Sequence, residues 1–438
     1  MALSENEYRV LNVLLKEPSL SYTEIANKTD LSVTSIRNLL FSLMDYSETD
    51  ELDDNKSSIV SSNNTYKNLN DKKNHNLNFY GKLRYEMLDF IRYDFFISCS
   101  NLEQMKNFKK FCEAHPYTSF RARMHGGENG IYATFFIPNG TLQMLLYSLD
   151  ILKENGIINN FEQIIKNALF YEFSTLKIEV FDVTQNRWNF KFSDFLEKFY
   201  DFKKNAKLID YFNQNRHKSI LDGLDKIDIM ILNEWGYGAG PRKTKAEILN
   251  NLQSTKFYSN FIKDLKLNRY IISDHVDSLL RTDILEYIGI SFDRRKIQIF
   301  AILFYVGRAD IKFLNLFANF IKSPDFPFET NLFVGDVDYD TKTAAFTWWA
   351  SFTPYLVSKF TEFLFENCCE LNTYIVAYNT QDIDNYPLYH ANFVCDKPNE
   401  GHWKDSIEEC LSNPLKIFFN EKQLQIYVNN YSNQIKND

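Results

Sequence analysis

The sequence predicts an α+β fold that combines two winged helix-turn-helix units with two ferredoxin-like β-α-β-β-α-β units in one chain. Three observations lead to this prediction. The first 46 residues have the pattern of three short helices with a tight turn. Strand and helix patterns then alternate over residues 79–183, and both patterns return in the same order after residue 225. The length of 438 residues suits several such domains.

The N-terminal segment, residues 1–46, is expected to be the first helix-turn-helix. Apolar residues follow helical spacing up to Pro18, which ends the first helix. Ser21 is expected to cap a second helix, because Glu24 stands three residues later as in a capping box. Ser32 is expected to cap a third helix, whose apolar face consists of Val33, Ile36, Leu39, Leu40 and Leu43.

Residues 47–78 are rich in Asn and Ser and poor in large apolar residues. Such a composition buries too little surface to order itself, so it predicts a flexible insertion. The first ferredoxin-like domain is expected at 79–183. Its elements in order are a strand at 93–99, a helix at 101–114, strands from 120 and at 131–137 around a glycine loop, a helix at 141–155, and strand segments near 157–163 and 176–183.

An aromatic-rich, largely helical connector is expected at 184–224. The second winged helix-turn-helix is expected at 225–296, with helices at 225–235, 243–252 and 257–266 and a last helix capped by Ser273. The second ferredoxin-like domain is expected at 297–380. Residues 381–438 show no clear pattern and are interpreted as a C-terminal tail.

Composition narrows the class of protein. Lys and Arg number 49 and Asp and Glu number 57, giving a net charge of −8, so any contact with nucleic acid must be local. The six cysteines form no CxxC pair, which suits a reducing compartment. No signal peptide and no membrane-spanning run is recognised, so a cytoplasmic protein is expected.

The best local match to a known family lies in Glu24-Ile25-Ala26 and in the run from Leu31 to Arg37. Together with the order of elements, it resembles the leucine-responsive regulator/AsnC family of prokaryotic transcription factors. The resemblance implies double-stranded DNA as partner and a small-molecule effector near the hairpin loops of the ferredoxin-like domains. Members of the family assemble through these domains, so the two copies here are expected to form an intramolecular pseudo-dimer, with a further homodimer left open.

Candidate DNA contacts lie on the third helix of each unit. In the first unit they are the polar residues off the apolar face, where Arg and Asn can read base edges and Ser and Thr can hold phosphates. They are Thr34, Ser35, Arg37, Asn38 and Ser42. This segment nevertheless holds more acidic than basic residues, which is unfavourable for DNA.

The second unit has more basic residues. Its candidate DNA contacts are Lys243 and Lys245 at the start of the second helix, polar residues of the last helix, and two arginines where a wing would reach the backbone. The polar residues of the last helix are His275, Ser278, Arg281 and Thr282, and the wing arginines are Arg294 and Arg295. Asp274 and Asp277 interrupt the face.

A possible effector loop runs from His125 to Gly130, and its candidate ligand contacts are Gly126, Gly127, Asn129 and Gly130. A simple hairpin turn explains the same glycines. The sequence contains no GxSxG, HExxH or paired Cys–His motif, so no enzyme is expected. No cofactor and no metal site is expected either, because the histidines and cysteines match no ligand spacing.

Two other functions remain open. The helix-turn-helix units could have lost DNA binding and serve as a protein-interaction or assembly module, which the acidic first unit favours. Alternatively, the chain could be a small-molecule sensor with its ligand between the two ferredoxin-like units.

Overall fold

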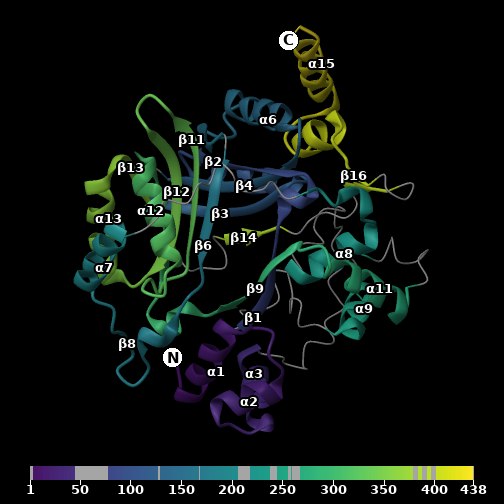
Figure 1. The fold of residues 1–438 in the computed structure, drawn as a ribbon. Helices are drawn as coiled ribbons and strands as arrows, with labels where there is room; N and C mark the ends of the chain where they lie inside the picture. Colours follow the sequence, from purple (N-terminus) through teal and green to yellow (C-terminus); the bar gives the residue numbers. More distant parts are fainter. Residues whose placement is uncertain are drawn as a thin grey trace.

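The computed structural model describes residues 3–44, 77–126, 129–166, 168–205, 218–236, 244–254, 258, 267–377, 383–386, 392–395 and 401–437. The expected insertion at 47–78 lies outside these residues except for its last two positions. Figure 1 shows the N-terminal helices at one end of the molecule and the C-terminal helix at the other.

The described chain contains two β-α-β-β-α-β units. In both, the strands lie in the order fourth, first, third, second, and the element order is the one that the sequence predicts. The first unit comprises β2 (Phe90–Ser98), α5 (Leu102–Ala114), β3 (Thr118–Gly126), β4 (Gly130–Pro138), α6 (Leu142–Glu154) and β5 (Asn160–Ile165). The second unit comprises β10 (Ala301–Asp310), α12 (Ile311–Lys322), β11 (Thr330–Asp338), β12 (Thr343–Phe352), α13 (Pro354–Asn367) and β13 (Cys368–Ala377).

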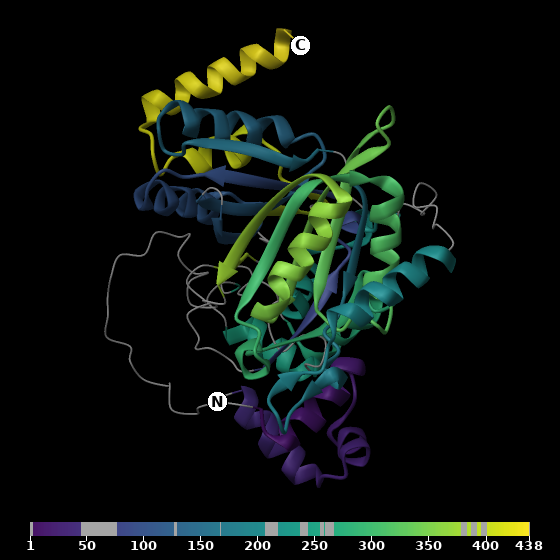
Figure 2. The same ribbon diagram turned by 90° about the vertical axis from the view of Figure 1, so that its left-hand side faces the viewer.

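The strands of both units belong to one hydrogen-bonded sheet, in which β3 meets β13 through Tyr374 opposite Gly126 and Ile375 opposite His125. Apolar side chains from both units share a buried cluster that includes Tyr132 and Phe304, whose rings lie 5.0 Å apart. The helices lie on the outer faces (Figure 2). Alternating side chains along each strand thus supply two layers, one under the helices and one between the units.

A separate two-stranded ribbon leads from the helix-turn-helix segments to the sheet. Strand β1 (Leu77–Leu83) pairs antiparallel with β9 (Leu285–Phe292). Each strand ends in a short 3₁₀ turn, η2 (Tyr85–Leu88) or η7 (Arg294–Ile297), before the first strand of a unit. A residue of positive φ follows each turn, Asp89 at 56° and Gln298 at 63°.

The helix-turn-helix segments pack crosswise. The first comprises α1 (Glu5–Lys16), α2 (Tyr22–Thr29) and α3 (Val33–Met44), and the second comprises α8 (Lys226–Gly236), α9 (Lys245–Ser254) and α11 (Arg269–Leu279). The first segment shares its hydrophobic cluster with the outer layer of the second unit. The second segment shares its cluster with the first unit. Each segment is therefore anchored to the unit that is more distant in sequence.

Each unit is followed by a trailing segment, which we call an arm, that covers the opposite unit. The first arm (168–205) contains β6 (Ala168–Ser174), η3 (Ile178–Val180), β7 (Phe181–Asp182), β8 (Arg187–Trp188) and α7 (Phe192–Asn205). Its strand β6 pairs with β11 of the second unit. The chain continues through η5 (Leu221–Gly223) to α8. The second arm (383–437) contains β14 (Ile383–Asn385), β15 (Phe393–Val394), β16 (His402–Trp403), the π-helical turn η9 (Glu408–Ser412), α14 (Asn413–Leu415) and α15 (Glu421–Asn437), and its β14 pairs with β3 of the first unit.

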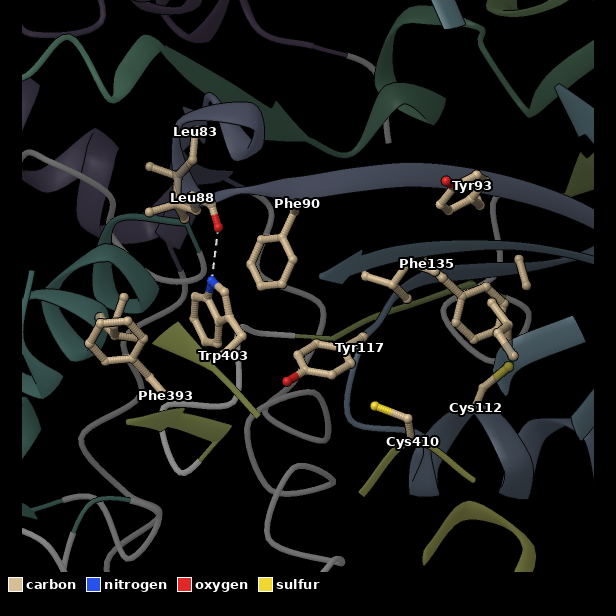
Figure 3. Packing of buried hydrophobic residues seen from close by; sticks show 14 of the residues in the cluster. Leu83, Leu88, Phe90, Tyr93, Cys112, Tyr117, Phe135, Phe393, Trp403 and Cys410 are labelled. Atoms are coloured by element: carbon tan, nitrogen blue, oxygen red, sulfur yellow. Dashed lines mark hydrogen bonds between the residues drawn. The ribbon is translucent and has the colours of Figure 1, made fainter. Parts of the chain in front are cut away.

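Both arms place a tryptophan against the 3₁₀ turn of the other half. Trp403 Nε1 donates to the carbonyl oxygen of Leu88 at 2.8 Å, as Figure 3 shows. Trp188 Nε1 donates to the carbonyl oxygen of Ile297 at 2.6 Å. Leu88 and Ile297 are the last residues of η2 and η7. The two contacts are therefore equivalent in position.

These contacts differ from the domain limits expected from the sequence. The range 79–183 includes part of β1, which pairs with β9, and all of β6, which completes the sheet of the other unit. The range 381–438 is no loose tail in its described parts, because Cys410, Leu411 and Leu415 are buried in the cluster of the first unit. Local patterns predict strands and helices but not which unit they join.

Candidate nucleic-acid interface

The first helix-turn-helix is fixed by side-chain caps at its helix starts. The Ser4 amide donates to Glu7 Oε2 at 2.8 Å, and the Glu7 amide donates to Ser4 Oγ at 3.3 Å. Ser21 and Glu24 form the same capping box, at 2.7 and 3.3 Å, which confirms the predicted cap of α2. Asp30, with φ of 55°, ends α2 in the left-handed conformation. This residue turns the chain sharply toward α3.

Helix α3 presents one apolar and one polar face. Ile36, Leu40 and Leu43 are buried in the cluster shared with the second unit. The five candidate contacts of this helix are all exposed, namely Thr34, Ser35, Arg37, Asn38 and Ser42. The sequence of α3 contains no acidic residue. The structure therefore brings the predicted residues together on one polar surface.

The acidic residues that the structure describes in this segment lie on α1 and α2 and at their C-terminal ends, and several are paired. Lys28 pairs with Glu17, and Arg9 pairs with Glu5 at 2.6 Å. Lys296 Nζ contacts Glu7 Oε1 at 2.8 Å and joins α1 to η7. Burial alone would raise the pKa of Glu7, but hydrogen bonds from Lys296 and Ser4 lower it. Pairing thus offsets part of the acidic charge that the composition shows.

The second segment differs at its third helix. Asn268 caps α11, because its Oδ1 accepts the amides of Tyr270 at 2.9 Å and Ile271 at 3.1 Å. The expectation that Ser273 caps this helix is wrong, since the helix begins one turn earlier. The exposed positions of its first turns carry Arg269, Tyr270, which is 83% exposed, and Asp274. Of these, only the guanidinium of Arg269 suits a phosphate backbone, and the carboxylate of Asp274 opposes it.

Two predicted DNA contacts of this segment are held inside it. Lys245 Nζ contacts Ser273 Oγ at 2.7 Å and both oxygens of Asp277 at 2.8 Å. His275 Nδ1 lies 2.8 Å from Asp228 Oδ1. These contacts join α11 to α9 and α8. The Lys245 ammonium and the Nδ1 of His275 therefore have carboxylate partners within the same segment.

The His275 contact is part of a carboxylate cluster. Asp225, Asp228 and His275 bring donor atoms within 4.8 Å of one another, which is a possible arrangement for a metal ion. Both carboxylates, however, cap α8, since Asp225 Oδ1 accepts the Ile227 amide at 2.8 Å and Asp228 Oδ2 accepts the Asp225 amide at 2.9 Å. The hydrogen bond to Asp228 raises the pKa of His275, and burial together with the charge of Asp228 raises the pKa of Asp225. A helix cap and an ion pair explain the cluster.

The remaining candidates of the second half are dispersed. Arg294 is buried and contacts Glu329 Oε2 at 2.6 Å, so the expected backbone contact at this residue is wrong. Arg295 is exposed and pairs with Asp293 at 2.7 Å. Ser278 and Arg281 are exposed at the end of α11, whereas Thr282 is half-buried and donates to the Leu279 carbonyl. Lys243 lies outside the described residues.

The glycine loop of the first unit has a packing role. A Cβ on Gly126 would lie 2.6 Å from the Thr373 carbonyl oxygen, where β3 meets β13. A Cβ on Gly130 would collide with the Ile97 carbonyl oxygen of β2. The exposed Asn129 accepts the Cys99 amide at its carbonyl at 3.1 Å, and Gly127 lies outside the described residues. Close approach of strands explains Gly126 and Gly130 without a ligand, as the simple hairpin interpretation expects.

Sequence reasoning missed Trp188 and Trp403. Each ends a short hairpin opposite a phenylalanine, Phe181 opposite Trp188 and Phe393 opposite Trp403. The sequence does contain a signal for them. After the last strand of each unit, a short hairpin pattern places a Phe in its first strand and a Trp in its second strand.

Comparison with known families identifies the N-terminal segment. Residues 3–46 match the family model described as winged helix-turn-helix DNA-binding. The protein therefore carries a winged helix-turn-helix DNA-binding domain at its N-terminus, which confirms the class predicted for this segment. The match ends where α3 ends, within two residues.

Two solved structures are similar in arrangement to most of the chain. One is siroheme decarboxylase NirDL in complex with an iron-uroporphyrin III analogue, 8% identical, covering 88% of this chain and 97% of that chain with a TM-score of 0.46. The other is siroheme decarboxylase NirDL, also 8% identical, covering 88% and 96% with a TM-score of 0.44. No curated protein matches the chain.

Both similar structures are of an enzyme, and this finding contradicts the expectation that the chain is not an enzyme. In the described part of the chain, no helix is both long and apolar enough to cross a membrane.

Proposed function

We propose that this protein is a DNA-binding transcriptional regulator of the leucine-responsive regulator/AsnC type, which holds double-stranded DNA through α3. The observation that carries the proposal is the polar, exposed face of α3 within a segment that matches winged helix-turn-helix DNA-binding domains. In such domains the second helix of the motif enters the major groove, and its first residues contact base edges. Arg37 and Asn38 are the side chains best suited to read guanine and adenine.

The rest of the proposal concerns assembly. We propose that the two β-α-β-β-α-β units are ferredoxin-like, arose by duplication and form an intramolecular pseudo-dimer. Their shared strand order supports this, and so does the crosswise packing of arms and helix-turn-helix segments. The matching contacts of Trp188 and Trp403 support it most directly, because two unrelated halves have no reason to repeat them.

A titration of genomic DNA fragments in a gel-shift assay tests DNA binding. We expect salt-sensitive binding by the intact chain, and loss of about 1–3 kcal/mol of binding free energy in Arg37→Ala. Arg9→Ala is the matched control, because it removes the same charge from α1, where Arg9 pairs with Glu5. Absence of salt-sensitive binding, or equal losses in both variants, would count against the proposal.

A small-molecule effector belongs to the same proposal. The inner layer between the two units holds a charged pair, in which Arg92 Nε lies 3.0 Å from Asp94 Oδ2, among aromatic rings. Such a layer can respond to a polar ligand that separates the units. A thermal-shift screen with amino acids and nucleotides tests this part, and we expect at least one to raise the unfolding temperature.

One observation favours a second function for the second helix-turn-helix. Beside Arg269, the exposed start of α11 carries Tyr270 and Asp274, whereas a DNA-reading helix favours cations and amides at such positions. Exposed tyrosine is frequent at protein interfaces. This segment would then contact another protein, and a pull-down in which Tyr270→Ala loses a stoichiometric partner without loss of DNA binding would support that function.

A further inference from the structure

The ribbon of β1 and β9, which connects the helix-turn-helix segments to the sheet, is joined to each unit by a short turn. Each joint consists of a single 3₁₀ turn and one residue of positive φ, Asp89 after η2 and Gln298 after η7. So short a turn has few internal hydrogen bonds. In η2, the Met87 amide donates to the Arg84 carbonyl at 3.0 Å, and the Asp89 amide donates to the Glu86 carbonyl at 3.3 Å. Contacts from outside must therefore fix its direction.

The arms supply such a contact at each joint. Trp403 and Leu88 are buried. The centroid of the Trp403 ring lies 4.5 Å from that of Phe90 and 5.1 Å from that of Phe393, so these rings flank the hydrogen bond. Figure 3 shows Trp403 between these rings, with its indole nitrogen directed at Leu88. A buried carbonyl oxygen that loses its hydrogen-bond donor costs free energy. This cost favours the one direction of the turn in which Leu88 reaches Trp403.

The second joint repeats the arrangement. Trp188 and Ile297 are buried, and Trp188 packs on Phe181 at 5.4 Å and Phe328 at 5.1 Å. The donor comes from the first arm, whereas the turn leads into the second unit. Each joint is thus held by the arm that follows the opposite unit.

We propose that Trp188 and Trp403 are positioning residues that set the direction of the ribbon relative to the two units, and thereby the placement of the helix-turn-helix segments on DNA. Only the part of this inference that concerns DNA rests on the proposed function. The ribbon transmits the direction because β1 and β9 are paired along their whole length, from Leu77 opposite Phe292 to Leu83 opposite Leu285. The inner face of the ribbon is also attached to the first arm, since Lys82 Nζ lies 3.6 Å from the ring centre of Tyr171.

Hydrogen-exchange mass spectrometry on the full chain without DNA tests the contact itself. We expect Trp403→Phe to speed exchange about five- to tenfold in residues 84–90 and Trp188→Phe to do so in residues 294–299. Trp349→Phe is the matched control, because Trp349 lies in the layer between the units, away from both turns. Equal acceleration in all three variants, or none at the turns, would overturn the proposal.

Position is tested by the distance between labels on Asn38 of α3 and Asp150 of α6, introduced as labelled non-natural residues because the chain has six cysteines. We expect a broader distance distribution in both turn variants and an unchanged one in the control. An unchanged distribution in the turn variants would show that the tryptophans only stabilise the fold, and would overturn the proposal. If Trp403→Phe fails to fold, its benzothiophene analogue removes the N–H while keeping the ring size.

Failure of the two ideas can be told apart. Both measurements above are made without DNA, so they test the tryptophans even if the intact protein binds no DNA. If the intact protein binds DNA, we expect the turn variants to bind about tenfold more weakly while Trp349→Phe binds normally. Normal binding by the turn variants would contradict the positioning role.

Discussion

Glu172 of the first arm and Lys322 of α12 form an ion pair in which Oε2 and Nζ lie 2.5 Å apart. Glu172 is buried on β6, which itself pairs with β11. The first arm is therefore attached to the second unit by main-chain and side-chain contacts together. This relationship makes the arm part of the unit that it covers.

Removal of Lys322 should weaken that attachment. Lys322→Met leaves the buried Glu172 carboxylate without its cation, and we expect a loss of about 1–2 kcal/mol in the free energy of unfolding. The loss stays modest because the Lys322 side chain is 47% exposed and water screens the pair. Urea unfolding followed by fluorescence measures it. Lys312→Met, an exposed change on the same helix, should be neutral, and an equal effect of both would contradict the assignment.

Truncation of Phe195 should uncover the second unit. Phe195 is 1% exposed, and its ring lies 4.9 Å from Phe360 and 5.4 Å from Phe363. We expect Phe195→Ala to cost about 3–5 kcal/mol of unfolding free energy, since it leaves a cavity under α7. Tyr200→Ala, at a 43% exposed position of the same helix, is the control. A small effect at Phe195 would mean that α7 is not part of the core.

Alanine at Gly130 distinguishes packing from ligand binding in the glycine loop. Its added Cβ would collide with the Ile97 carbonyl oxygen, so we expect lower thermal stability whether or not any small molecule is present. Gly223→Ala is the control, because a Cβ there meets nothing within 4 Å. If Gly130→Ala keeps its stability but loses a response to an effector, Gly130 contacts a ligand as the sequence predicts.

The second helix-turn-helix should lose stability as pH rises. The hydrogen bond to Asp228 raises the pKa of His275 above its ordinary value of 6.5, and burial raises the pKa of Asp225. Asp274 also faces His275 with its charge. The stabilisation is therefore complete below pH 6.5 and is lost as pH rises through the raised pKa of His275.

Urea unfolding between about pH 5.5 and 8.5 measures this dependence. Comparison of the intact chain with His275→Gln isolates the contribution of the imidazole, because glutamine keeps a hydrogen-bonding group without the titration. We expect the difference in unfolding free energy between the two proteins to shrink toward high pH. A difference that stays constant would show that folding leaves the pKa of His275 unchanged.

Local patterns in the sequence were sufficient for most elements. The caps at Ser21 and Glu24 and the spacing of Ile36, Leu40 and Leu43 depend on neighbours within four residues, so they could be predicted. The last helix of the second segment was placed one turn too late because Asn268 and Ser273 are both good caps. Only the burial of Ile272 decides between them.

The candidate site was harder to predict in the second half. Lys245 and Arg294 were expected to face DNA from their charge alone, yet their partners Asp277 and Glu329 stand more than thirty residues away along the chain. No local pattern reveals such partners. For the same reason the exchange of arms was missed, since the pairing partners of β6 and β14 belong to the opposite unit, far away along the chain.

The exchange of arms has a consequence for how the chain is completed during synthesis. The ribosome makes the first unit early, but the segment that shields its Phe90 and Tyr117 rings includes Trp403, which follows the whole second unit. The apolar surface around these rings must therefore wait, exposed or protected by a chaperone, until the second unit and its arm have been translated. A ribosome that stalls within the second unit would release a chain whose first unit is left uncovered.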